Sequence, residues 1–481
     1  MFWRGVLGYL PANLVQGLTG VLTLVVFTRL LSPAQFGHYA LGFSVMGLLH
    51  TGLLTWNEAA LARFQAGAEQ RGDAHHHAAT VLRAWMLLAG VVALASGVAA
   101  ALPLEPGLKL AVVAGALAVL PRSFAKIAQE RRRAIGDVRG AVTIDLVQSI
   151  GAFAIGAACA WAGFGGAAPL IGIALAAVLS VAWAVPAELA AARGGTAEAG
   201  RALTYARYGL PVAGSLILSL VLTSTDRFLL AAFLDDAAVG VYHAGYSLAN
   251  RTLDVMFIWL GAAGGPALVM ALERGGQAGL APQAREQAAL MWLLGLPAAV
   301  GLAMVAAPLS QVMLGPQLAD GAAQVTPWIA ASALLAGITT YYYHQAFTLG
   351  RRTGLLLAAM AAPAVANVAL NLLLIPRFGL QGALWATLAS FALGLAASAG
   401  LGRRAMALPT PWVVIAQAAG ATAAMATVVS MVPPLGGVAE LAAKSSVGIA
   451  VYGALALVMD AGALRSRALP LARRLATRLA A

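Results

Sequence analysis

Residues 223–259, TSTDRFLLAAFLDDAAVGVYHAGYSLANRTLDVMFIW, predict two apolar helices joined by a short acidic turn. The first helix is expected to end near Leu234 and the second to begin near Val239. Helices of this length and apolar character cross a hydrocarbon core of ~30 Å. Charged side chains within such helices are costly, so they usually face the interior of a helix bundle or a watery cavity. The stretch is therefore typical of a membrane-spanning bundle with a polar interior.

Charged and polar side chains on these two helices are the main candidates for a substrate-binding surface. Asp226 and Arg227 are neighbours in the first helix, where successive residues lie ~100° apart around the axis. We therefore expect one of them to line a cavity and the other to reach the outer interface. The second helix has two polar rows at i, i+4 spacing, which share one helix face. The rows are Tyr242, Tyr246, Asn250 and Asp254, and, beside them, His243, Ser247 and Arg251.

Arg251 lies about twelve residues into its span, which places it roughly 18 Å deep and near the midplane. Two interpretations of this cation stay open. Its planar guanidinium suits the oxygen atoms of a diphosphate in a substrate cavity. Alternatively, it forms a structural salt bridge with Asp226 or with Asp254, which follows it at i+3.

The composition excludes several classes of function. The chain has 481 residues, of which 61% are hydrophobic and only 10% charged, whereas soluble proteins have about 25% charged residues. The net charge of +12 is better explained by arginines on one side of a membrane than by nucleic acid, which we do not expect as a partner. A single cysteine, Cys159, excludes a disulfide framework. No phosphate loop is present, and we expect no ATP hydrolysis, metal or other cofactor; the tract His75–His77 is expected to be solvated.

Apolar segments long enough to span a membrane recur along the whole chain, and there are fourteen of them. They lie at 8–31, 37–61, 79–102, 108–128, 141–163, 167–190, 209–234, 239–263, 288–313, 324–347, 353–375, 380–401, 411–432 and 446–463. With the N-terminus in the cytoplasm, 22 of the 30 lysines and arginines fall in cytoplasmic segments and 5 on the other side. This asymmetry predicts that both termini are cytoplasmic.

The chain repeats itself at an offset of 203 residues. Residues 33–39, PAQFGHY, correspond to residues 236–242, DAAVGVY, and Trp56 corresponds to Trp259. Because six spans separate the copies, the two halves have the same topology, as in transporters built from parallel repeats. We therefore predict an all-α polytopic membrane protein with two six-helix lobes and two extra C-terminal helices. The predicted parts are an N-lobe at 1–191, a cytoplasmic linker at 192–208, a C-lobe at 209–402, an appendage at 403–464 and a basic amphipathic tail at 465–481.

Three further charged residues are candidates for the transport path. Arg29 ends the first span, where it either contacts substrate or anchors the helix at the interface. Glu58 and Arg63 lie near the cytoplasmic end of the second span. They either close an inner gate as a pair or are solvated neighbours, and the second interpretation is favoured.

Three motifs resemble those of a known family. Residues 29–39, RLLSPAQFGHY, resemble the end of the first span of the oligosaccharide (O-antigen-type) flippases. Residues 225–242, which contain TDRFLL and AVGVY, resemble the turn between the seventh and eighth spans of that family. Residues 367–383, NVALNLLLIPRFGLQGA, resemble the turn after its eleventh span. The superfamily also contains multidrug extrusion proteins and the peptidoglycan-precursor flippase. The resemblance covers residues 1 to about 402 and implies two lobes around a central cavity that work by alternating access.

The resemblance implies a substrate, partners and a location. The expected cargo is an undecaprenyl-diphosphate-linked oligosaccharide, carried across the inner membrane of a bacterial cell for surface polysaccharide synthesis. The expected partners are this substrate, membrane lipids and other membrane proteins of polysaccharide assembly. A cation-coupled antiporter of drugs or metabolites is the alternative, although the first span has no acidic residue of the kind that such proteins often use. A membrane glycosyltransferase or polymerase is disfavoured because no sizeable outer loop is present.

Overall fold

The computed structural model describes residues 2–465, which form helices and no strand. The chain divides into two compact units, Met1–His243 and Ala244–Ala481, which we describe separately. Apart from Arg465, the predicted amphipathic tail lies outside the described residues. The predicted boundaries of the lobes and the linker stay a prediction.

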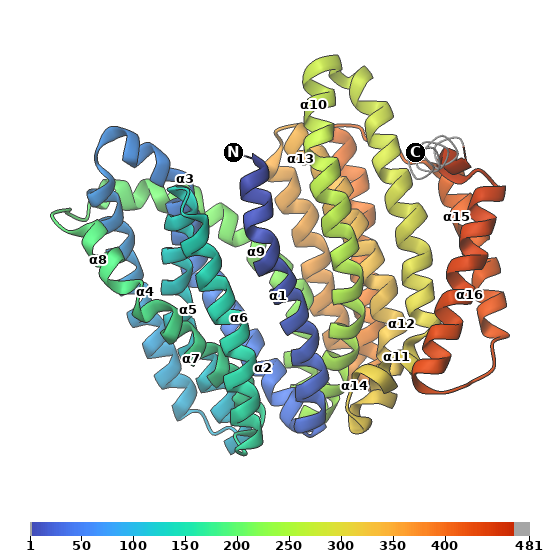
Figure 1. The fold of residues 1–481 in the computed structure, drawn as a ribbon, viewed down its shortest axis with the longest axis horizontal. Coiled ribbons are helices and arrows are strands. Elements are labelled where there is room, and N and C mark those ends of the chain that lie inside the picture. The colour runs from blue at the N-terminus through green and yellow to red at the C-terminus, as the bar shows by residue number, and fades with distance from the viewer. Residues whose placement is uncertain (1, 466–481) are drawn as a thin grey trace, which may run out of the picture. The chain divides into compact units, whose positions relative to one another are not determined.

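Unit 1 contains the first nine α-helices and the beginning of the tenth (Figure 1). A π-helical turn, η1, continues α2 into α3, and a 3-10 turn, η2, precedes α7. The elements are α1 (Phe2–Leu30), α2 (Pro33–Leu49), η1 (His50–Leu54), α3 (Thr55–Arg71), α4 (Ala74–Ala101), α5 (Pro106–Ala134), α6 (Val138–Trp161), η2 (Gly165–Ala167), α7 (Ala168–Ala182), α8 (Val185–Ala192), α9 (Ala199–Phe233) and α10 (Asp236–Met304).

Unit 2 contains most of α10 and the helices that follow it. It has a π-helical turn of its own, η3, between α12 and α13. The remaining elements are α11 (Ala306–Met313), α12 (Pro316–Ile338), η3 (Thr339–Tyr343), α13 (His344–Leu349), α14 (Thr353–Ala405), α15 (Trp412–Ser430), α16 (Gly437–Val458) and η4 (Ala461–Ala463).

All fourteen predicted spans fall on helices, which confirms a polytopic all-α membrane protein. Eleven helices of the described residues are long and apolar enough to cross a membrane. Two of them bend at a glycine, α10 at Gly276 (φ 57°) and α14 at Gly379 (φ 57°). Helix α14 therefore covers two predicted spans, and α10 covers one and most of a second, which ends in α11. Glycine tolerates these left-handed dihedral angles, which other residues rarely adopt. The predicted span 37–61 is divided among α2, η1 and α3.

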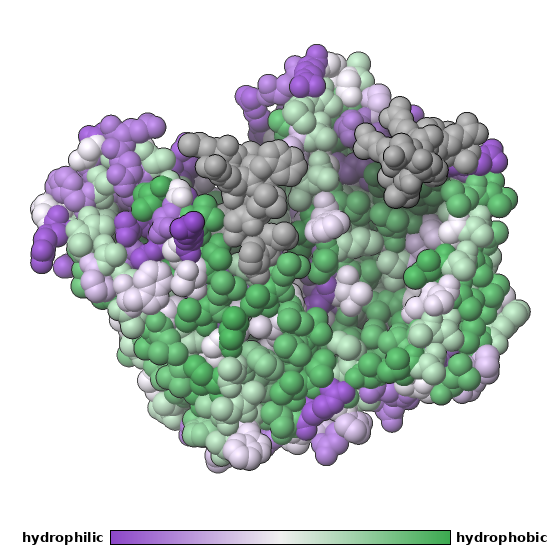
Figure 2. Space-filling model, in the orientation of Figure 1, coloured by the Kyte–Doolittle hydropathy of each residue, from purple (hydrophilic) through white to green (hydrophobic). Residues whose placement is uncertain are grey.

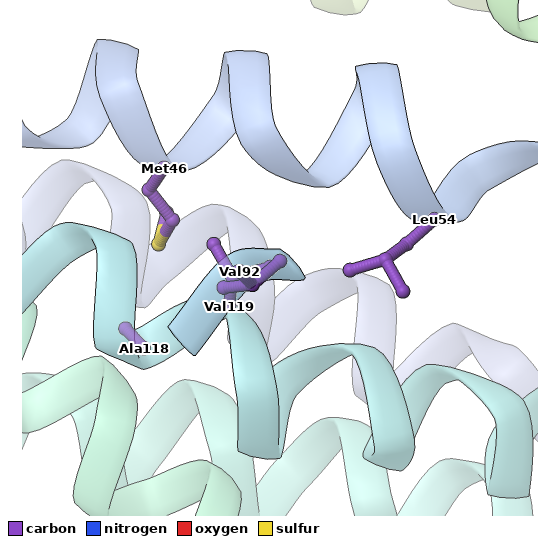
Figure 3. Close-up of a cluster of buried hydrophobic side chains, with 5 residues drawn as sticks. All are labelled: Met46, Leu54, Val92, Ala118 and Val119. Carbon is purple, nitrogen blue, oxygen red and sulfur yellow. The ribbon is translucent and has the colours of Figure 1, made fainter. Parts of the chain in front are cut away.

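The core of unit 1 is built where α2, α4 and α5 pack together. Met46 and Leu54 point from α2 and η1 toward Val92 of α4 and Val119 of α5 (Figure 3). Gly42 of α2 lies so close to α5 that an added Cβ atom would be 2.5 Å from the carbonyl oxygen of Ala111. Small residues allow such close contact between helices in membranes, where dispersion rather than the hydrophobic effect holds helices together.

Large apolar side chains also cover the outer surfaces of the helices. Trp161, Leu94 and Ile449 are 87%, 70% and 76% exposed. Figure 2 shows hydrophobic residues along the visible flanks of the helices and hydrophilic residues concentrated near their ends. Contiguous exposed apolar surface of this kind marks contact with lipid.

Candidate functional site

The two copies of the repeated motif pack against each other in unit 1. Gly37 of α2 and Gly240 of α10, which are 203 positions apart, lie at this contact. A Cβ atom added to Gly37 would be 1.9 Å from the carbonyl oxygen of Asp236, and one added to Gly240 would be 2.0 Å from that of Pro33. The backbones of the two helices therefore touch, and each motif contributes the same glycine. The repeat detected in the sequence is thus also a local two-fold contact in the structure.

Ion pairs flank this glycine contact. The imidazole Nε2 of His38 lies 2.9 Å from Oδ2 of Asp236 and 3.5 Å from Oε2 of Glu105. Glu105 also caps α5 by accepting the backbone N–H of Leu108 at 2.8 Å. The backbone N–H groups of Gly107 and Leu108 hold the pKa of the Glu105 carboxyl below its ordinary value. The carboxylate therefore stays charged and holds the first turn of α5 near α2.

Asp226 and Arg227 are both buried, with 0% and 7% of their surface exposed. Asp226 accepts a hydrogen bond of 2.5 Å from the hydroxyl of Tyr242, and Arg227 Nε donates to Nδ1 of His243 at 3.2 Å. The prediction that one of the two reaches the outer interface is therefore wrong. The physical reason is that two successive residues of α10 each bond one of them. Tyr242 bonds Asp226, and His243 bonds Arg227.

The polar row continues from α10 into unit 2. Tyr246 and Asp254 are half-buried, and Asn250 Nδ2 donates to Oδ2 of Asp254 at 2.6 Å. Arg251 is exposed, and no hydrogen bond or ion pair joins it to any residue that the structure describes. The salt bridge to Asp254, one of the two interpretations of Arg251, is therefore absent, since Asn250 occupies that carboxylate.

Arg29, Glu58 and Arg63 have different surroundings. Arg29 is exposed at the end of α1, where its guanidinium donates to the carbonyl oxygen of Val25 at 2.7 Å. Glu58 is only 6% exposed and is bonded to His50 rather than to Arg63. Arg63 is exposed and lies 5.8 Å from the centre of the Phe64 ring. Neither the gate pair nor the favoured interpretation, solvated neighbours, fits this buried carboxylate.

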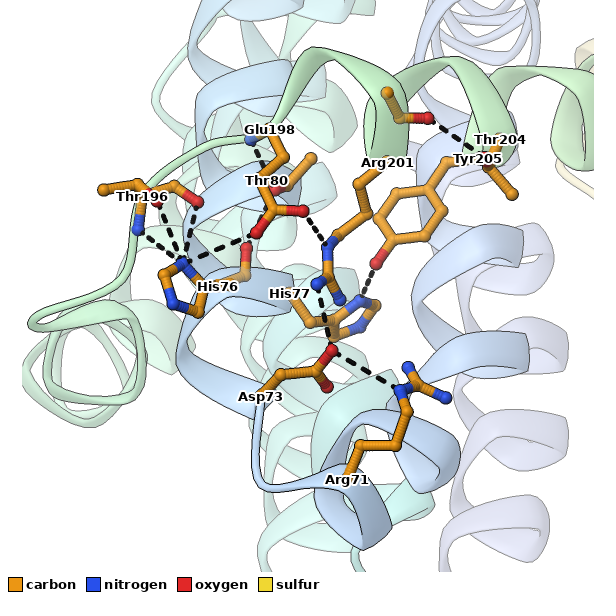
Figure 4. Close-up of polar contacts among 11 residues, drawn as sticks. Arg71, Asp73, His76, His77, Thr80, Thr196, Glu198, Arg201, Thr204 and Tyr205 are labelled. Carbon is orange, nitrogen blue, oxygen red and sulfur yellow. Dashed lines mark hydrogen bonds and ion pairs between the residues drawn. The ribbon is translucent and has the colours of Figure 1, made fainter.

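Polar side chains also tie the α3–α4 turn to the beginning of α9 (Figure 4). Asp73 accepts a bond of 2.9 Å from Arg201, and Arg201 Nε donates to Glu198 at 3.1 Å. His77 is fully buried and is bonded through Nδ1 to the hydroxyl of Tyr205. The prediction that the histidine tract is solvated is therefore wrong for His77, because α9 covers this side of α4.

We expect Asp73→Asn to weaken this attachment. The hydrogen bond from Arg201 is the main cause that holds the pKa of Asp73 below its ordinary value of 3.8. A lowered pKa means that the contribution to stability is present above the pKa of the unfolded chain and is lost as the pH falls through the folded pKa. Asp73→Asn should thus lower the unfolding temperature by roughly 1–3 °C at pH 7, because the two side chains are only partly buried and water screens the pair.

Thermal unfolding in detergent at a series of pH values tests this expectation. The difference between the D73N variant and the native protein should shrink as the pH falls below 3.8. Arg71→Gln is the matched control, because Arg71 is the weaker partner of Asp73, at 3.4 Å. Equal unfolding temperatures for the native and D73N proteins at pH 7 would contradict the attachment.

An apolar groove is present in unit 2. It has a volume of about 680 Å³ and lies between the second half of α10 and the two C-terminal helices α15 and α16. Its walls include Pro297, Leu302, Met425 and Gly448. Lys444 reaches its edge and pairs with Glu440 at 2.6 Å. The predicted C-terminal appendage therefore forms one wall of a hydrophobic groove, which the sequence did not indicate.

Comparison with known proteins identifies the family to which the chain belongs. Residues 26–322 match the family described as polysaccharide biosynthesis protein, and the chain belongs to this family. No curated protein matches the chain.

Solved structures show the same fold at low sequence identity. The structure is similar to "Lipid II flippase MurJ, inward closed conformation", with a TM-score of 0.74 and 13% identity over 95% of this chain and 99% of that one. It is also similar to the inward-facing conformation of a multidrug resistance MATE family transporter of the MOP superfamily. That match has a TM-score of 0.63 and 15% identity over 81% of this chain and 94% of the other. The fold predicted from the sequence resemblance is thereby confirmed.

Proposed function

We propose that the protein moves a polyprenyl-diphosphate-linked oligosaccharide from the cytoplasmic to the outer leaflet of a bacterial inner membrane. Membership of the polysaccharide biosynthesis family and the fold shared with a lipid II flippase support this substrate class. Both termini lie in the cytoplasm, as the distribution of lysine and arginine indicates. Membrane proteins of polysaccharide assembly are the further partners of this role.

The exposed position of Arg251 within a span is the observation that supports the proposal most directly. It is an exposed guanidinium within a span, and Asn250 rather than Arg251 engages the adjacent carboxylate of Asp254. A charge at this depth is retained only where a polar surface or a ligand compensates it. A diphosphate supplies oxygen acceptors that match the two-pronged geometry of the guanidinium. Asn250, Asp254 and Tyr246 on the same face offer hydrogen-bonding groups to the sugars.

Asp226, Arg227 and Tyr242 form buried hydrogen bonds within unit 1. Their buried bonds fix the α9–α10 hairpin on which the row begins. Arg29, at the end of α1, is the candidate for a second contact with the anionic head group. Because buried charged networks are rigid when every member has a partner, these bonds hold the beginning of the row in place without taking part in binding.

The apolar groove in unit 2 suits the lipid tail of such a substrate. Its walls at Leu302, Met425 and Gly448 are apolar, and burial of a hydrocarbon chain contributes about 0.8 kcal/mol per methylene. A small hydrophilic substrate would have no use for a groove of this kind. The energy for transport comes from a gradient or from the membrane potential, which supplies about 2.3 kcal/mol per charge per 100 mV.

Deletion of the gene tests the proposal. The deletion strain should lose its surface glycan while lipid-linked repeat units accumulate on the inner leaflet, because synthesis continues and transport stops. Plasmid-borne native protein should restore the glycan, and the R251Q variant should not. A deletion strain that keeps its surface glycan and becomes sensitive to cationic drugs would overturn the proposal in favour of the antiporter, whose fold is shared.

A further inference from the structure

The apolar groove of unit 2 runs along most of helix α16. Leu441 and Leu457 both line it, and the 16 positions between them correspond to about 24 Å along the helix axis. The hydrocarbon core of a membrane is ~30 Å thick, so an acyl chain of one leaflet extends over about half of that distance. The groove is therefore long enough to hold such a chain completely.

A lysine–glutamate pair lies near one end of the groove. Lys444 lines the groove close to Leu441, and its Nζ is 2.6 Å from Oε1 of Glu440. The side chains of Lys444 and Glu440 are 16% and 9% exposed. Glu440 lies in the first turn of α16, where its Oε2 accepts the backbone N–H of Gly436 at 2.9 Å. The beginning of the helix therefore fixes the carboxylate, and the carboxylate holds the ammonium at the end of the groove.

Both members of the pair keep hydrogen-bonding capacity. An ammonium has three donors, and the structure records one hydrogen bond from Lys444, which goes to Glu440. The two oxygens of a carboxylate accept about four hydrogen bonds, so Glu440 retains an acceptor position beside those used by Lys444 and Gly436. The pair thus offers donors and an acceptor to a polar head group at the end of the groove.

The net charge of the pair decides which head group fits it. Lys444 and Glu440 together are neutral, so a purely anionic head would be attracted by the ammonium and repelled by the carboxylate. A zwitterionic head supplies a phosphate for the ammonium and a cation for the carboxylate. The ammonium of ethanolamine also donates hydrogen bonds, whereas the quaternary nitrogen of choline has no N–H. The head group of phosphatidylethanolamine therefore matches both the charges and the hydrogen-bonding groups.

The remaining surroundings of the pair carry no opposing charge on the elements that meet it. Gln311 of α11, which accepts the backbone N–H of Gly437 at 3.3 Å, is a neutral amide. The groove walls next to Lys444 are apolar at Leu309 and Val429. The charge pattern at this end of the groove is therefore that of Lys444 and Glu440.

We propose that this pair is a head-group site for phosphatidylethanolamine, with one acyl chain of the phospholipid in the apolar groove. The phosphate binds Nζ of Lys444, and the ethanolamine ammonium binds the carboxylate of Glu440. In the topology that we propose, α16 begins on the outer side of the membrane, so the lipid enters from the outer leaflet. The site goes beyond the proposed function and does not depend on it, because the phospholipid occupies the groove when no polyprenyl tail is bound.

A bound phospholipid should hold the C-terminal helices against the second half of α10, beside which they lie (Figure 1). The hydroxyl of Tyr452 in α16 donates to the carbonyl oxygen of Leu293 in α10 at 2.5 Å. An acyl chain in the groove adds apolar contacts to both walls, and a ligand that binds the folded state raises the unfolding temperature. Thermal unfolding therefore measures the binding.

The native protein, purified in detergent without added lipid, is titrated with three synthetic phospholipids that carry identical acyl chains. Their head groups are phosphatidylethanolamine, phosphatidylcholine and phosphatidylglycerol, and the apparent affinity follows from the unfolding temperature at each concentration. Phosphatidylethanolamine should bind about 10-fold more tightly than either of the others, the factor expected for one hydrogen bond to a charged group. Equal affinities, or a preference for phosphatidylglycerol, would overturn the zwitterionic site.

Two variants of the pair should change the lipid preference in different ways. Lys444→Gln should abolish the preference among the three lipids, because the phosphate loses its cation. Glu440→Gln should make phosphatidylglycerol the tightest ligand, because Lys444 then faces an anionic head without the repelling carboxylate. Arg377→Gln is the matched control, since Arg377 is exposed in unit 2 and does not line the groove. A Glu440→Gln protein that still prefers phosphatidylethanolamine would contradict the contact between Glu440 and the amine.

Gly453→Leu tests the place of the acyl chain. Gly453 lines the groove, and an added Cβ atom there meets nothing within 4 Å. The leucine side chain should therefore fill the groove without strain and weaken the binding of all three lipids. Gly420→Leu is the control, because Gly420 is exposed in α15, has equal space around it and lies outside the groove. Native affinities in G453L, with an unchanged unfolding temperature before lipid is added, would overturn the placement of the chain.

These titrations contain no transport substrate, so their outcome is separate from that of the proposed function. Protein that prefers phosphatidylethanolamine but never moves a polyprenyl-linked sugar keeps the lipid site and loses the proposed function. Protein that moves the sugar and binds the three phospholipids equally keeps the proposed function and loses the lipid site.

Discussion

Gly240→Ala and Gly37→Ala should each destabilise the protein and reduce transport severely. The alanine Cβ would lie 2.0 Å from the carbonyl oxygen of Pro33 in the first variant and 1.9 Å from that of Asp236 in the second. A backbone atom cannot move away as the end of a side chain can, so α2 and α10 must separate. Overpacking of this kind costs typically ~1–3 kcal/mol, and backbone contacts place these variants at the upper end of that range.

The matched control, Gly214→Ala, should change stability in the opposite direction. Gly214 lies in α9, and an added Cβ atom there would meet nothing within 4 Å. Helix propensity alone predicts that glycine to alanine in a helix stabilises by roughly 1 kcal/mol, so Gly214→Ala should be neutral or stabilising. Unfolding temperature and the yield of monodisperse protein in detergent measure the difference. Equal stability of G240A and G214A would show that the close contact of the two motifs is unimportant.

Arg251→Gln should reduce transport of the lipid-linked oligosaccharide about 10- to 100-fold with normal membrane insertion. A hydrogen bond to a charged group contributes about 1.5–3 kcal/mol, and each 1.4 kcal/mol corresponds to about one factor of ten. Arg251→Lys should recover part of the activity, because the ammonium keeps the charge and loses the planar fork. The measurement is the movement of a fluorescent polyprenyl-diphosphate-linked sugar across vesicle membranes that contain the purified protein.

Two controls separate a substrate role of Arg251 from a structural one. Arg274 lies in the same helix and is exposed, and Arg274→Gln should leave the rate unchanged. The double change Arg251→Leu with Asp254→Leu should stay inactive, because Asp254 is bonded to Asn250. Full activity of this double variant would instead show that Arg251 only compensates Asp254.

The amino-acid sequence by itself determined the class of fold and the position of the spans. Every backbone polar group within the hydrocarbon core must be hydrogen-bonded, so a segment that crosses the core forms a helix. The thickness of the core sets the length of such a helix, and long apolar segments in the sequence therefore locate the spans. The offset of 203 residues between two motifs likewise predicted a repeat, and Gly37 and Gly240 meet at the contact between its copies. These properties are local in sequence or depend on spacing alone.

The partners of the charged residues were decided by the tertiary structure. Sequence spacing offered Arg63 as one possible partner of Glu58 and Asp254 as one possible partner of Arg251, whereas the structure pairs Glu58 with His50 and Asp254 with Asn250. The π-helical turn η1 changes the register between His50 and Glu58, and no sequence pattern predicted this turn. Arg227 likewise turns inward because His243 of the next helix meets it. A buried charge takes the partner that helix packing places within reach, and that choice depends on the rotation of each helix about its axis, which hydropathy does not specify.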